Sequence, residues 1–353
     1  MSYTDGWKAL NLEMPGRVPR TEYSAAEMHF DLIRAVTGIP VDISSPDAVK
    51  HEARVAFMRA WNFDLCWSTL IGGEVFGDLR TSMGHAVYAA GGTDFRPDAH
   101  SAFEGPEAAL AFDPWEALGP QDKEALRRRF DDHYRANRAA FPDAVNMTGI
   151  YVTGISGLLE LFGWEHLLLA LGMDATGMGA TLARYASWIQ QYFDALAESE
   201  APVVMVHDDI VWTSGPFYDP AWYRAHLFPC YRRYFAPLLA RGKKILYTSD
   251  GDYTLFIDDI VDCGVHGLVL EPMTDMGYIA ERYGDRIAFI GNADTRVLLD
   301  GDPAAIRAEV ERCMAIGKRC PGFIMAVGNH IPPNTPVDAA LYYNRIYEEL
   351  SVR

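Results

Sequence analysis

The chain has 353 residues, of which 49% are hydrophobic and 22% are charged, a balance typical of a globular protein with a large core. Its 48 acidic residues outnumber its 31 basic residues and give a formal net charge of −17, so the phosphate backbone of a nucleic acid would be repelled. The sequence opens without the basic and then apolar pattern of a secretory signal, and its richest apolar run, LLLALGM, is far shorter than the ~18 residues of a membrane span. We therefore expect a cytoplasmic protein that binds neither nucleic acid nor a membrane.

The first half of the chain predicts helices at 22–38 and 46–60, followed by strands at 61–71 and 144–154. The segment between these two strands is rich in Gly, Pro and aromatic residues, and we expect an elaborated loop region there. Within it, the basic cluster at 127–129 is flanked by acids, which is typical of a solvated helix face rather than an anion site.

The second half alternates short apolar runs, which turn polar at their ends, with longer amphipathic segments. The helical pattern is clearest where Asp302 can cap a helix, Pro303 suits its first turn and Gly317 ends it. This alternation indicates βαβ units, and therefore parallel strands covered by helices. We predict a (β/α)₈ TIM barrel whose helical N-terminal extension covers residues 1–60. Its clearest strands are expected at 202–210, 243–252, 266–272, 287–294 and 322–330.

The sequence lacks both an interdomain linker and a paired cysteine motif, which predicts the domain organisation and the redox state of the thiols. No long Gly-, Ser- or Pro-rich segment and no close repeat divides the chain, so we predict a single domain over residues 1–353. The five cysteines lie far apart and form no Cys-x-x-Cys pair, which favours buried thiols over a disulfide frame or a zinc knuckle. The cysteines are Cys66, Cys230, Cys263, Cys313 and Cys320.

Polar residues end each of the five clear strands, and the carboxyl ends of barrel strands all lie at one rim. These side chains should therefore converge on one active site, although they are spread along the sequence. A cluster of carboxylates with an imidazole can hold a metal ion, donate a proton or shift the pKa values of its own members. The residues are His207, Asp208, Asp209, Asp250, Asp252, Glu271, Asn292, Asp294, Asn329 and His330.

Structural alternatives stay open for several of these residues. Asp208 and Asp209 could cap a turn, and Asp250 lies in the turn-forming string Ser-Asp-Gly-Asp. Asn292 follows a glycine and could simply close a turn. Among the other histidines, structural roles are expected for His226 and His266.

The strand ends also carry a resemblance to a known family. The string VGNHIPPNTPVD (327–338) resembles the C-terminal signature of the uroporphyrinogen decarboxylase superfamily. The string YTSDGDYTLFIDDIVDCGVHGLVLEP (247–272) resembles its strand-acid-Gly segment, followed by a helix and a strand that ends in Glu-Pro. Residues 290–299 and 207–229 are similar to its Gly-Asn strand end and its Asp-rich strand. The resemblance implies a (β/α)₈ barrel with its cleft at the carboxyl ends of the strands.

The superfamily contains two main chemistries, and this chain departs from both patterns. Its decarboxylases remove acetate carboxyl groups from a tetrapyrrole without a cofactor, but their N-terminal arginine signature is missing here, and only Arg17 and Arg20 could replace it. Its methyltransferases move a methyl group between a small substrate and a corrinoid protein. The thiolate zinc ligands of the thiol-using members are replaced by Tyr247, Ser249 and Asn329. The chemistry must therefore rest on oxygen and imidazole groups.

The leading hypothesis that the resemblance implies is a methyltransferase that demethylates a small methoxylated or methylated substrate and passes the methyl group to a separate corrinoid protein. The leaving oxygen then needs a proton or a Lewis acid. We assign Glu271 or Asp250 as acid or metal ligand, His330 as ligand or proton donor, and Tyr247 as hydrogen-bond donor to the leaving group. A divalent metal such as zinc would be held by Glu271, Asp250, His207 and His330. Substrate contacts are expected from His207, Asp208, Asp209, Asp252, Asn292, Asp294 and Asn329.

Two alternatives stay open. The first is a cofactor-free decarboxylase of uroporphyrinogen or a related carboxylated substrate, in which an Asp binds a developing cation near Tyr247 or Tyr151. The second is a non-catalytic binding barrel, against which the density of acidic rim residues argues, because like charges cost stability unless they serve a function. The resemblance also implies a homodimer.

Overall fold

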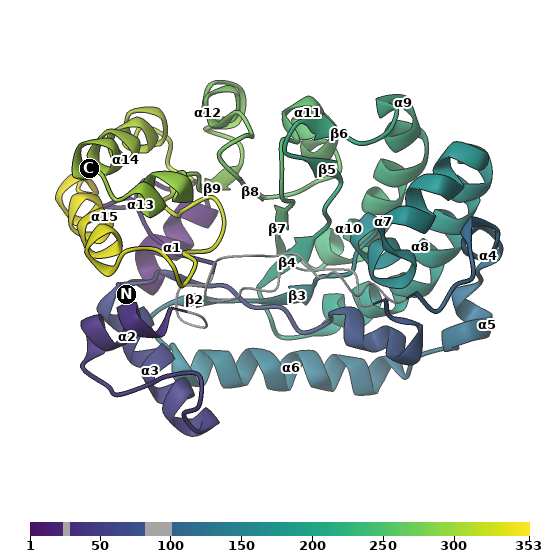
Figure 1. The fold of residues 1–353 in the computed structure, drawn as a ribbon, viewed down its shortest axis with the longest axis horizontal. Helices are drawn as coiled ribbons and strands as arrows, with labels where there is room; N and C mark the ends of the chain where they lie inside the picture. The colour runs from purple at the N-terminus through teal and green to yellow at the C-terminus, as the bar shows by residue number, and fades with distance from the viewer. Residues whose placement is uncertain (24–28, 82–100) are drawn as a thin grey trace.

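The computed structural model describes residues 1–23, 29–81 and 101–353, and a parallel sheet lies at its centre (Figure 1). Six of the described strands are hydrogen-bonded in the order β10-β9-β8-β7-β4-β3, and β1 pairs in parallel with β2, directly before β3. The strands are β1 (Leu65–Cys66), β2 (Val145–Asn146), β3 (Thr148–Ile150), β4 (Val203–His207), β7 (Lys244–Thr248), β8 (Gly267–Val269), β9 (Ala288–Ile290) and β10 (Phe323–Ile324).

Residues 19–21 connect the two ends of this strand order. The N–H of Met325, after β10, donates to the carbonyl of Pro19 (2.8 Å), and the N–H of Thr21 donates back to Met325 (3.0 Å). On the other side, the N–H of Asp64, before β1, donates to the carbonyl of Arg20 (2.8 Å). The predicted (β/α)₈ barrel is confirmed, and residues 19–21, where the sequence predicted no strand, form a bridge between the segments next to β10 and β1.

Helices cover the outside of the sheet, and the first part of the chain also forms helices (Figure 1). A short antiparallel hairpin, β5 (Val211–Trp212) and β6 (Gly215–Pro216), follows β4. The helices are α1 (Tyr3–Leu10), α2 (Phe30–Thr37), α3 (Asp47–Ala60), α4 (Pro106–Ala111), α5 (Pro114–Leu118), α6 (Lys123–Ala140), α7 (Ile155–Met173), α8 (Ala175–Glu198), α9 (Pro220–Trp222), α10 (Phe228–Ala240), α11 (Ile257–Val261), α12 (Met276–Tyr283), α13 (Thr295–Asp300), α14 (Pro303–Gly317) and α15 (Val337–Leu350).

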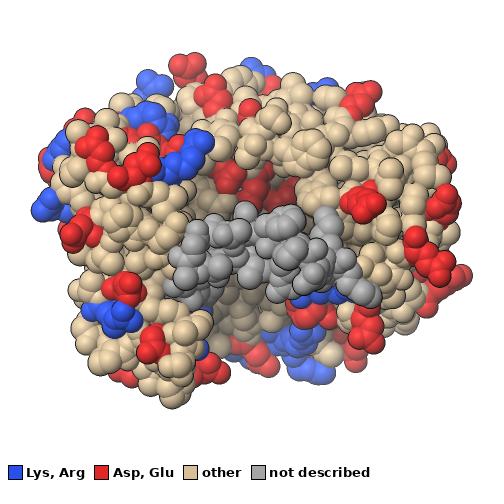
Figure 2. All heavy atoms as spheres, in the orientation of Figure 1, with Lys and Arg blue, Asp and Glu red and all other residues tan. Residues whose placement is uncertain are grey.

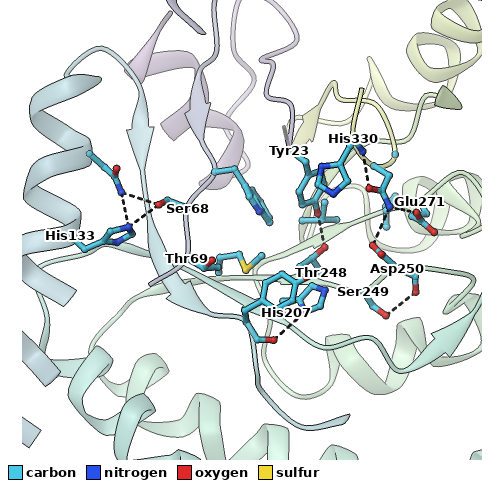
Figure 3. A pocket seen from close by; sticks show the side chains of 18 of the residues that line it. Tyr23, Ser68, Thr69, His133, His207, Thr248, Ser249, Asp250, Glu271 and His330 are labelled. Carbon is cyan, nitrogen blue, oxygen red and sulfur yellow. Dashed lines mark hydrogen bonds between the residues drawn. The ribbon is translucent and has the colours of Figure 1, made fainter. Parts of the chain in front are cut away.

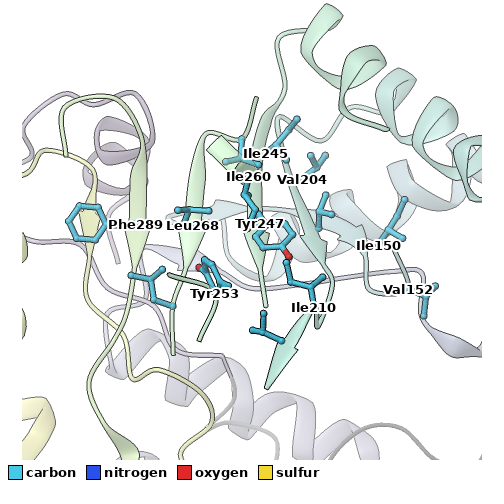
Figure 4. Close-up of a cluster of buried hydrophobic side chains, with 14 of the residues drawn as sticks. Ile150, Val152, Val204, Ile210, Ile245, Tyr247, Tyr253, Ile260, Leu268 and Phe289 are labelled. Carbon is cyan, nitrogen blue, oxygen red and sulfur yellow. The ribbon is translucent and has the colours of Figure 1, made fainter. Parts of the chain in front are cut away.

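Alternation along the strands separates an inner from an outer apolar layer. Inside the barrel, Met205 and Leu246 belong to one cluster of buried side chains, which Ala9 and Leu10 of α1 join. Outside it, Val204, Val206, Ile245, Tyr247, Leu268 and Phe289 pack in the larger cluster with the surrounding helices (Figure 4). Because successive side chains of a strand point to opposite faces, His207 faces inward like Met205, whereas Asp208 faces outward.

The region between the first two predicted strands is more helical than expected. The expected loop contains the short helices α4 and α5, apart from residues 82–100, which lie outside the described residues. The 18-residue α6 agrees with the helix face expected around 127–129. In α6, Arg127 pairs with Glu124 and with the buried Asp131 (2.5 Å), in keeping with a helix face rather than an anion site. The helix predicted at 22–38 begins at Phe30 within the described chain, and residues 24–28 are not described.

Two further expectations concern buried groups. All five cysteines are free thiols and buried, which confirms the sequence prediction. The expectation that no apolar stretch is long enough to span a membrane needs correction, because α7 meets that test by length and composition. However, 67% of its apolar window is buried inside the protein, as in the core helix of a globular domain.

Candidate active site

A pocket of about 410 Å³ lies where the carboxyl ends of the strands meet. Residues that end or follow β3, β4, β7, β8 and β10 line it, together with side chains of α3 and α6. Acidic side chains are visible in the hollow at the centre of the face shown in Figure 2. Figure 3 shows Ser68 and His133 on one side of the pocket and Asp250, Glu271 and His330 on the other. The candidate site therefore lies at the carboxyl rim of the barrel.

Two carboxyl groups and one amide form the acidic end of the pocket. Glu271, after β8, accepts hydrogen bonds from the backbone N–H of Gly251 (2.6 Å) and from the side-chain amide of Asn329. The same amide nitrogen lies 3.4 Å from Oδ1 of Asp250, after β7. Both oxygens of Glu271 face N–H donors, which stabilise its ionised form against the effect of burial.

Asp250 is open to the pocket, and its surroundings favour the protonated form. Loss of bulk water around the group, followed by the charges of Asp209 and Glu271, raises the pKa of Asp250 well above its ordinary value. Burial also raises the pKa of Glu271, while its donors from Asn329 and Gly251 oppose that shift. Of these two carboxyl groups, Asp250 is therefore the one that holds a proton.

His207 carries a positive charge at the base of the pocket. Its Nε2 lies 3.1 Å from Oδ1 of Asp209, and its Nδ1 lies 3.1 Å from the carbonyl oxygen of Tyr151. Both neighbours are hydrogen-bond acceptors, and both favour the imidazolium form of the ring, in which each nitrogen carries a proton. Burial opposes the charge, but the Asp209 carboxylate outweighs it and the pKa of His207 is raised to about 9. The ring of Tyr151 stacks on the imidazole at 3.6 Å.

His330 differs from His207 because it is uncharged. Burial lowers the pKa of His330 to about 4, so near neutral pH the ring is a neutral imidazole. The role of His330 as ligand or proton donor stays a prediction, and a neutral ring could donate only through its N–H group. Its ring meets the ring of Tyr23 edge-on at 6.4 Å, and the Tyr23 hydroxyl lies 2.5 Å from that of Thr248.

Asp208 and Tyr247, two predicted site residues, do not line the pocket. Tyr247 is buried in the outer apolar layer, where its hydroxyl donates to the carbonyl of Asp208 (3.1 Å; Figure 4). The Asp208 carboxylate accepts the N–H of Ser156 in the first turn of α7 (2.6 Å) and the hydroxyl of Tyr231 (2.5 Å). Strand alternation turns both side chains away from the barrel interior, so neither is positioned to contact a substrate.

The other predicted site residues lie behind the pocket or in turns next to it. Asp209 accepts the N–H of Asp250 (2.9 Å) as well as contacting His207, and so positions both residues. Asn292 donates to the backbone carbonyl of Glu271 (3.1 Å). The last two residues, Asp252 and Asp294, make local hydrogen bonds in a turn or at the start of a helix. Asp252 accepts the N–H of Thr254, and Asp294 accepts the N–H of Arg296.

Several residues that line the pocket were not predicted as site residues from the sequence. Trp67 follows Leu65 by two positions, and Thr248 follows Leu246 by two, so strand alternation could have identified both. Arg54, on α3, and His133, on α6, show no such signal because they lie on helices far from the strand ends in sequence.

The expected metal set does not assemble. Within residues 1–23, 29–81 and 101–353, no group of three or more His, Cys, Asp or Glu side chains is arranged to hold a metal ion. The ring nitrogens of His207 face two acceptors, and the oxygens of Glu271 face two N–H donors. These residues do not fit a zinc site, and we derive no step through a metal.

Arg17 and Arg20, the sequence's only substitutes for a carboxylate-binding arginine loop, are engaged elsewhere. Arg17 pairs with Asp64 (2.6 Å). Arg20 is fully buried, pairs with Glu22 (2.9 Å) and lies 4.4 Å over the ring of Trp61. Neither lines the pocket.

The fold and the site define the class of this protein: a parallel (β/α)₈ barrel with an acidic cleft at the carboxyl ends of its strands. Comparison with known protein families identifies the family. A family model described as uroporphyrinogen decarboxylase (URO-D) matches residues 104–347, more than half of the chain. The chain therefore belongs to the uroporphyrinogen decarboxylase family.

Curated relatives support the same assignment. A uroporphyrinogen decarboxylase from Chromohalobacter salexigens is 28% identical over 203 residues, which cover 54% of this chain and 53% of that protein. One from Pseudomonas aeruginosa is 29% identical over 177 residues, 48% of each chain. The chain thus spans about half the length of the curated relatives it matches. Among solved structures, a methyltransferase from Methanosarcina mazei superposes with a TM-score of 0.66 over 98% of both chains at 17% identity, a likeness of fold alone.

Proposed function

We propose that this chain is a methyltransferase that removes a methyl group from a small methoxylated or methylated substrate and passes it to a separate corrinoid protein. The observation that carries the proposal is the Asp250 carboxyl group, which faces a small pocket next to Glu271 and whose pKa is raised. A pocket of about 410 Å³ is of the size that encloses a small ligand.

In this proposal Asp250 is the general acid. Demethylation breaks the bond between the methyl carbon and the substrate oxygen, the electron pair stays on the oxygen, and that oxygen takes the proton of Asp250. A reduced corrinoid on the partner protein would supply the nucleophile for the methyl group. Burial, and then the charges of Asp209 and Glu271, favour the protonated form of Asp250, and Asn329 and Gly251 hold Glu271 in place.

Decarboxylation is the second candidate, because the named relatives at 28 and 29% identity are uroporphyrinogen decarboxylases. Electrostatics favour methyl transfer. A substrate with eight carboxylates would meet Asp250 and Glu271 in the pocket, while Arg54 is the one lysine or arginine among its described lining residues. Arg17 and Arg20, which could have bound substrate carboxylates, pair with acids outside the pocket.

Methyl transfer to cob(I)alamin from a panel of methoxylated aromatics and betaines tests the proposal, with the change in corrinoid absorbance as readout. We expect transfer from at least one methoxylated aromatic, whose leaving oxygen needs a proton, and a fall of about 10²- to 10⁴-fold in kcat with that substrate for Asp250→Asn. Asp262→Asn, an exposed aspartate, is the matched control and should match the wild type.

The proposal fails if no panel member transfers its methyl group, or if Asp250→Asn is as active as the wild type. Release of carbon dioxide from uroporphyrinogen at a useful rate, with no methyl transfer, would establish the second candidate instead.

A further inference from the structure

Two loops carry the carboxyl groups of the candidate site, and a buried threonine joins them. Asp250 lies in the loop after β7, and Glu271 lies in the loop after β8 (Figure 3). Thr274, three residues after Glu271, is 1% exposed and is not among the described residues that line the pocket. Any effect of its side chain on the chemistry must therefore pass through the groups that it contacts.

The hydroxyl group of Thr274 makes two hydrogen bonds to the loop that carries Asp250. It donates to the carbonyl of Gly251 (2.9 Å) and accepts the N–H of Tyr253 (3.2 Å). The N–H of Gly251 donates back to the carboxylate of Glu271 (2.6 Å). The residue next to Asp250 is thus bound to both Thr274 and Glu271, and the two loops are held in one register.

The conformation of Gly251 makes this double contact possible. Its φ of +82° lies in the left-handed region that favours glycine, and a Cβ atom there would lie 2.5 Å from the carbonyl oxygen of Trp212. The N–H and the carbonyl of Gly251 both bind the loop after β8. Because this glycine follows Asp250 directly, the same contacts position the backbone of Asp250 next to Glu271.

The backbone of Thr274 and the buried Asn292 fix the other loop. The N–H of Thr274 donates to the carbonyl of Glu271 (3.1 Å) and closes a turn over residues 271–274. The side-chain amide of Asn292 donates to the same carbonyl (3.1 Å) and to that of Thr274 (3.2 Å), and its oxygen accepts from Arg312 of α14 (3.0 Å). The turn that presents Glu271 is therefore fixed to the barrel, and the Thr274 hydroxyl extends from it to the loop of Asp250.

The separation of the two carboxyl groups matters because the interaction of charges weakens with distance and with access of water. Asp209 and His207 face Asp250 from the end of β4. Glu271 and Asn329 face it from the loops after β8 and β10. Loss of bulk water, and then the two neighbouring carboxylates, raise the pKa of Asp250, whereas His207 and Asn329 lower it. A loop that moved away from Glu271 would admit water and lose part of this effect.

We propose that Thr274 is a positioning residue for methyl transfer: by binding the loop of Asp250 to the turn of Glu271, its hydroxyl sets the separation of the two carboxyl groups and holds Asp250 where a general acid is needed. The inference rests on the proposed function for the role of Asp250 as acid. The coupling of the two carboxyl groups through Thr274 does not depend on a substrate and can be measured on the chain alone.

Nuclear magnetic resonance of the full chain, labelled with carbon-13 in the aspartate carboxyl groups, tests the coupling without substrate or corrinoid. The signal of Asp250 is identified by its absence in Asp250→Asn, and its titration gives the pKa of that group. Two variants, Thr274→Val and Thr274→Ala, remove the hydroxyl group, and Thr274→Ser retains it. Thr181→Val is the matched control, since Thr181 is buried in α8, away from the pocket. Its hydroxyl likewise donates to a carbonyl, that of Leu110 (2.9 Å), and accepts from Arg184 (2.9 Å).

We expect the pKa of Asp250 to be lower in Thr274→Val and Thr274→Ala than in the wild type, because the freed loop admits water and separates the carboxyl groups. Thr274→Ser should restore the wild-type value, and Thr181→Val should keep it although it also loses a buried hydroxyl. For methyl transfer, kcat should fall by about 10- to 100-fold in the two variants without the hydroxyl, as misplacement of a catalytic group does. Their KM should change little, since Thr274 does not line the pocket.

An unchanged pKa of Asp250 in both variants without the hydroxyl would overturn the inference. A shift of the same size in Thr181→Val, or a Thr274→Ser variant that titrates like Thr274→Val, would overturn it as well. The two proposals can fail separately. A pKa of Asp250 that depends on the Thr274 hydroxyl, in a chain that transfers no methyl group from any panel member, would refute the proposed function alone. Methyl transfer that depends on Asp250, with a pKa of Asp250 that does not depend on Thr274, would refute the positioning role alone.

Discussion

Asp250 depends on its neighbour Glu271 for its protonation state, since the Glu271 charge is one cause of its raised pKa. Glu271→Gln keeps the side-chain shape and can still accept the N–H of Gly251, but it removes the charge. We expect the pKa of Asp250 to fall in this variant. A general acid acts only while protonated, so the rate should fall as pH rises through the pKa of Asp250. This alkaline limb should move to lower pH in Glu271→Gln.

The measurement is kcat for methyl transfer across the pH range, in the wild type, Glu271→Gln and Glu281→Gln. Glu281 is exposed on α12, outside the pocket, so its variant should retain the wild-type profile. An alkaline limb at the same pH in Glu271→Gln and the wild type would show that the charge of Glu271 does not raise the pKa of Asp250.

Strand alternation decides which rim residues the sequence could predict. His207, Asp250, Glu271, Asn329 and His330 line the pocket, because they lie on the inner face of a strand or in the loop just after it. Asp208 and Tyr247 stand in equally polar strings but alternate to the outer layer. Arg54 and His133 reach the pocket from helices, and no local pattern marks a helical residue that a distant strand end will meet.

At the scale of elements, Asp208 joins β4 to the start of α7 and to α10. Its carboxylate is fully buried and accepts from Ser156 and Tyr231, and burial raises its pKa to about 6 against these bonds. In Asp208→Ala both donors lose their partner inside the protein. We expect the free energy of unfolding to fall by about 2–5 kcal/mol, the sum of a lost helix cap and an unsatisfied buried hydroxyl.

Urea titration measures the free energy of unfolding of Asp208→Ala, and Asp302→Ala is the matched control. Asp302 caps α14 from an exposed position through the N–H of Ala304 (3.0 Å), so its loss should cost only about 1 kcal/mol. A cost for Asp208→Ala no larger than that for Asp302→Ala would contradict the role given to the buried carboxylate.

The bridging segment at residues 19–21 shows why some parts of the barrel are not predicted from the sequence. Its sequence, within PGRVPRT, has two prolines and two arginines and lacks apolar alternation. The segment is extended between two neighbours and exchanges hydrogen bonds with both, Met325 on one side and Asp64 on the other. Such a segment is defined by tertiary contacts, whereas β4 and β7 have an apolar pattern of their own, from which the sequence predicts them directly.

At the scale of the whole molecule, the alternation of strands and helices was enough to predict the barrel, because a parallel sheet with helices outside has few ways to arrange itself. The second half contributes most of that pattern. The single domain and the homodimer stay predictions.

The stability of the whole molecule should depend on pH through His207. Its pKa is raised from 6.5 to about 9 in the folded chain by Asp209, against the effect of burial. Between these two values the folded chain holds a proton that the unfolded chain has released, so the free energy of unfolding falls as pH rises through this window. Asp250, whose pKa is also raised by Asp209, acts in the same direction.

Asp209→Asn isolates this contribution. The amide oxygen can still accept from the N–H of Asp250, but without the charge the pKa values of His207 and Asp250 should both fall. We expect the variant to lose less stability than the wild type between pH 6.5 and 9, the window set by His207. Urea titrations at several pH values across it measure the slope, with the exposed Asp132→Asn as control. Parallel slopes in wild type and Asp209→Asn would mean that His207 is uncharged in the folded chain, and the imidazolium at the base of the pocket would have to be abandoned.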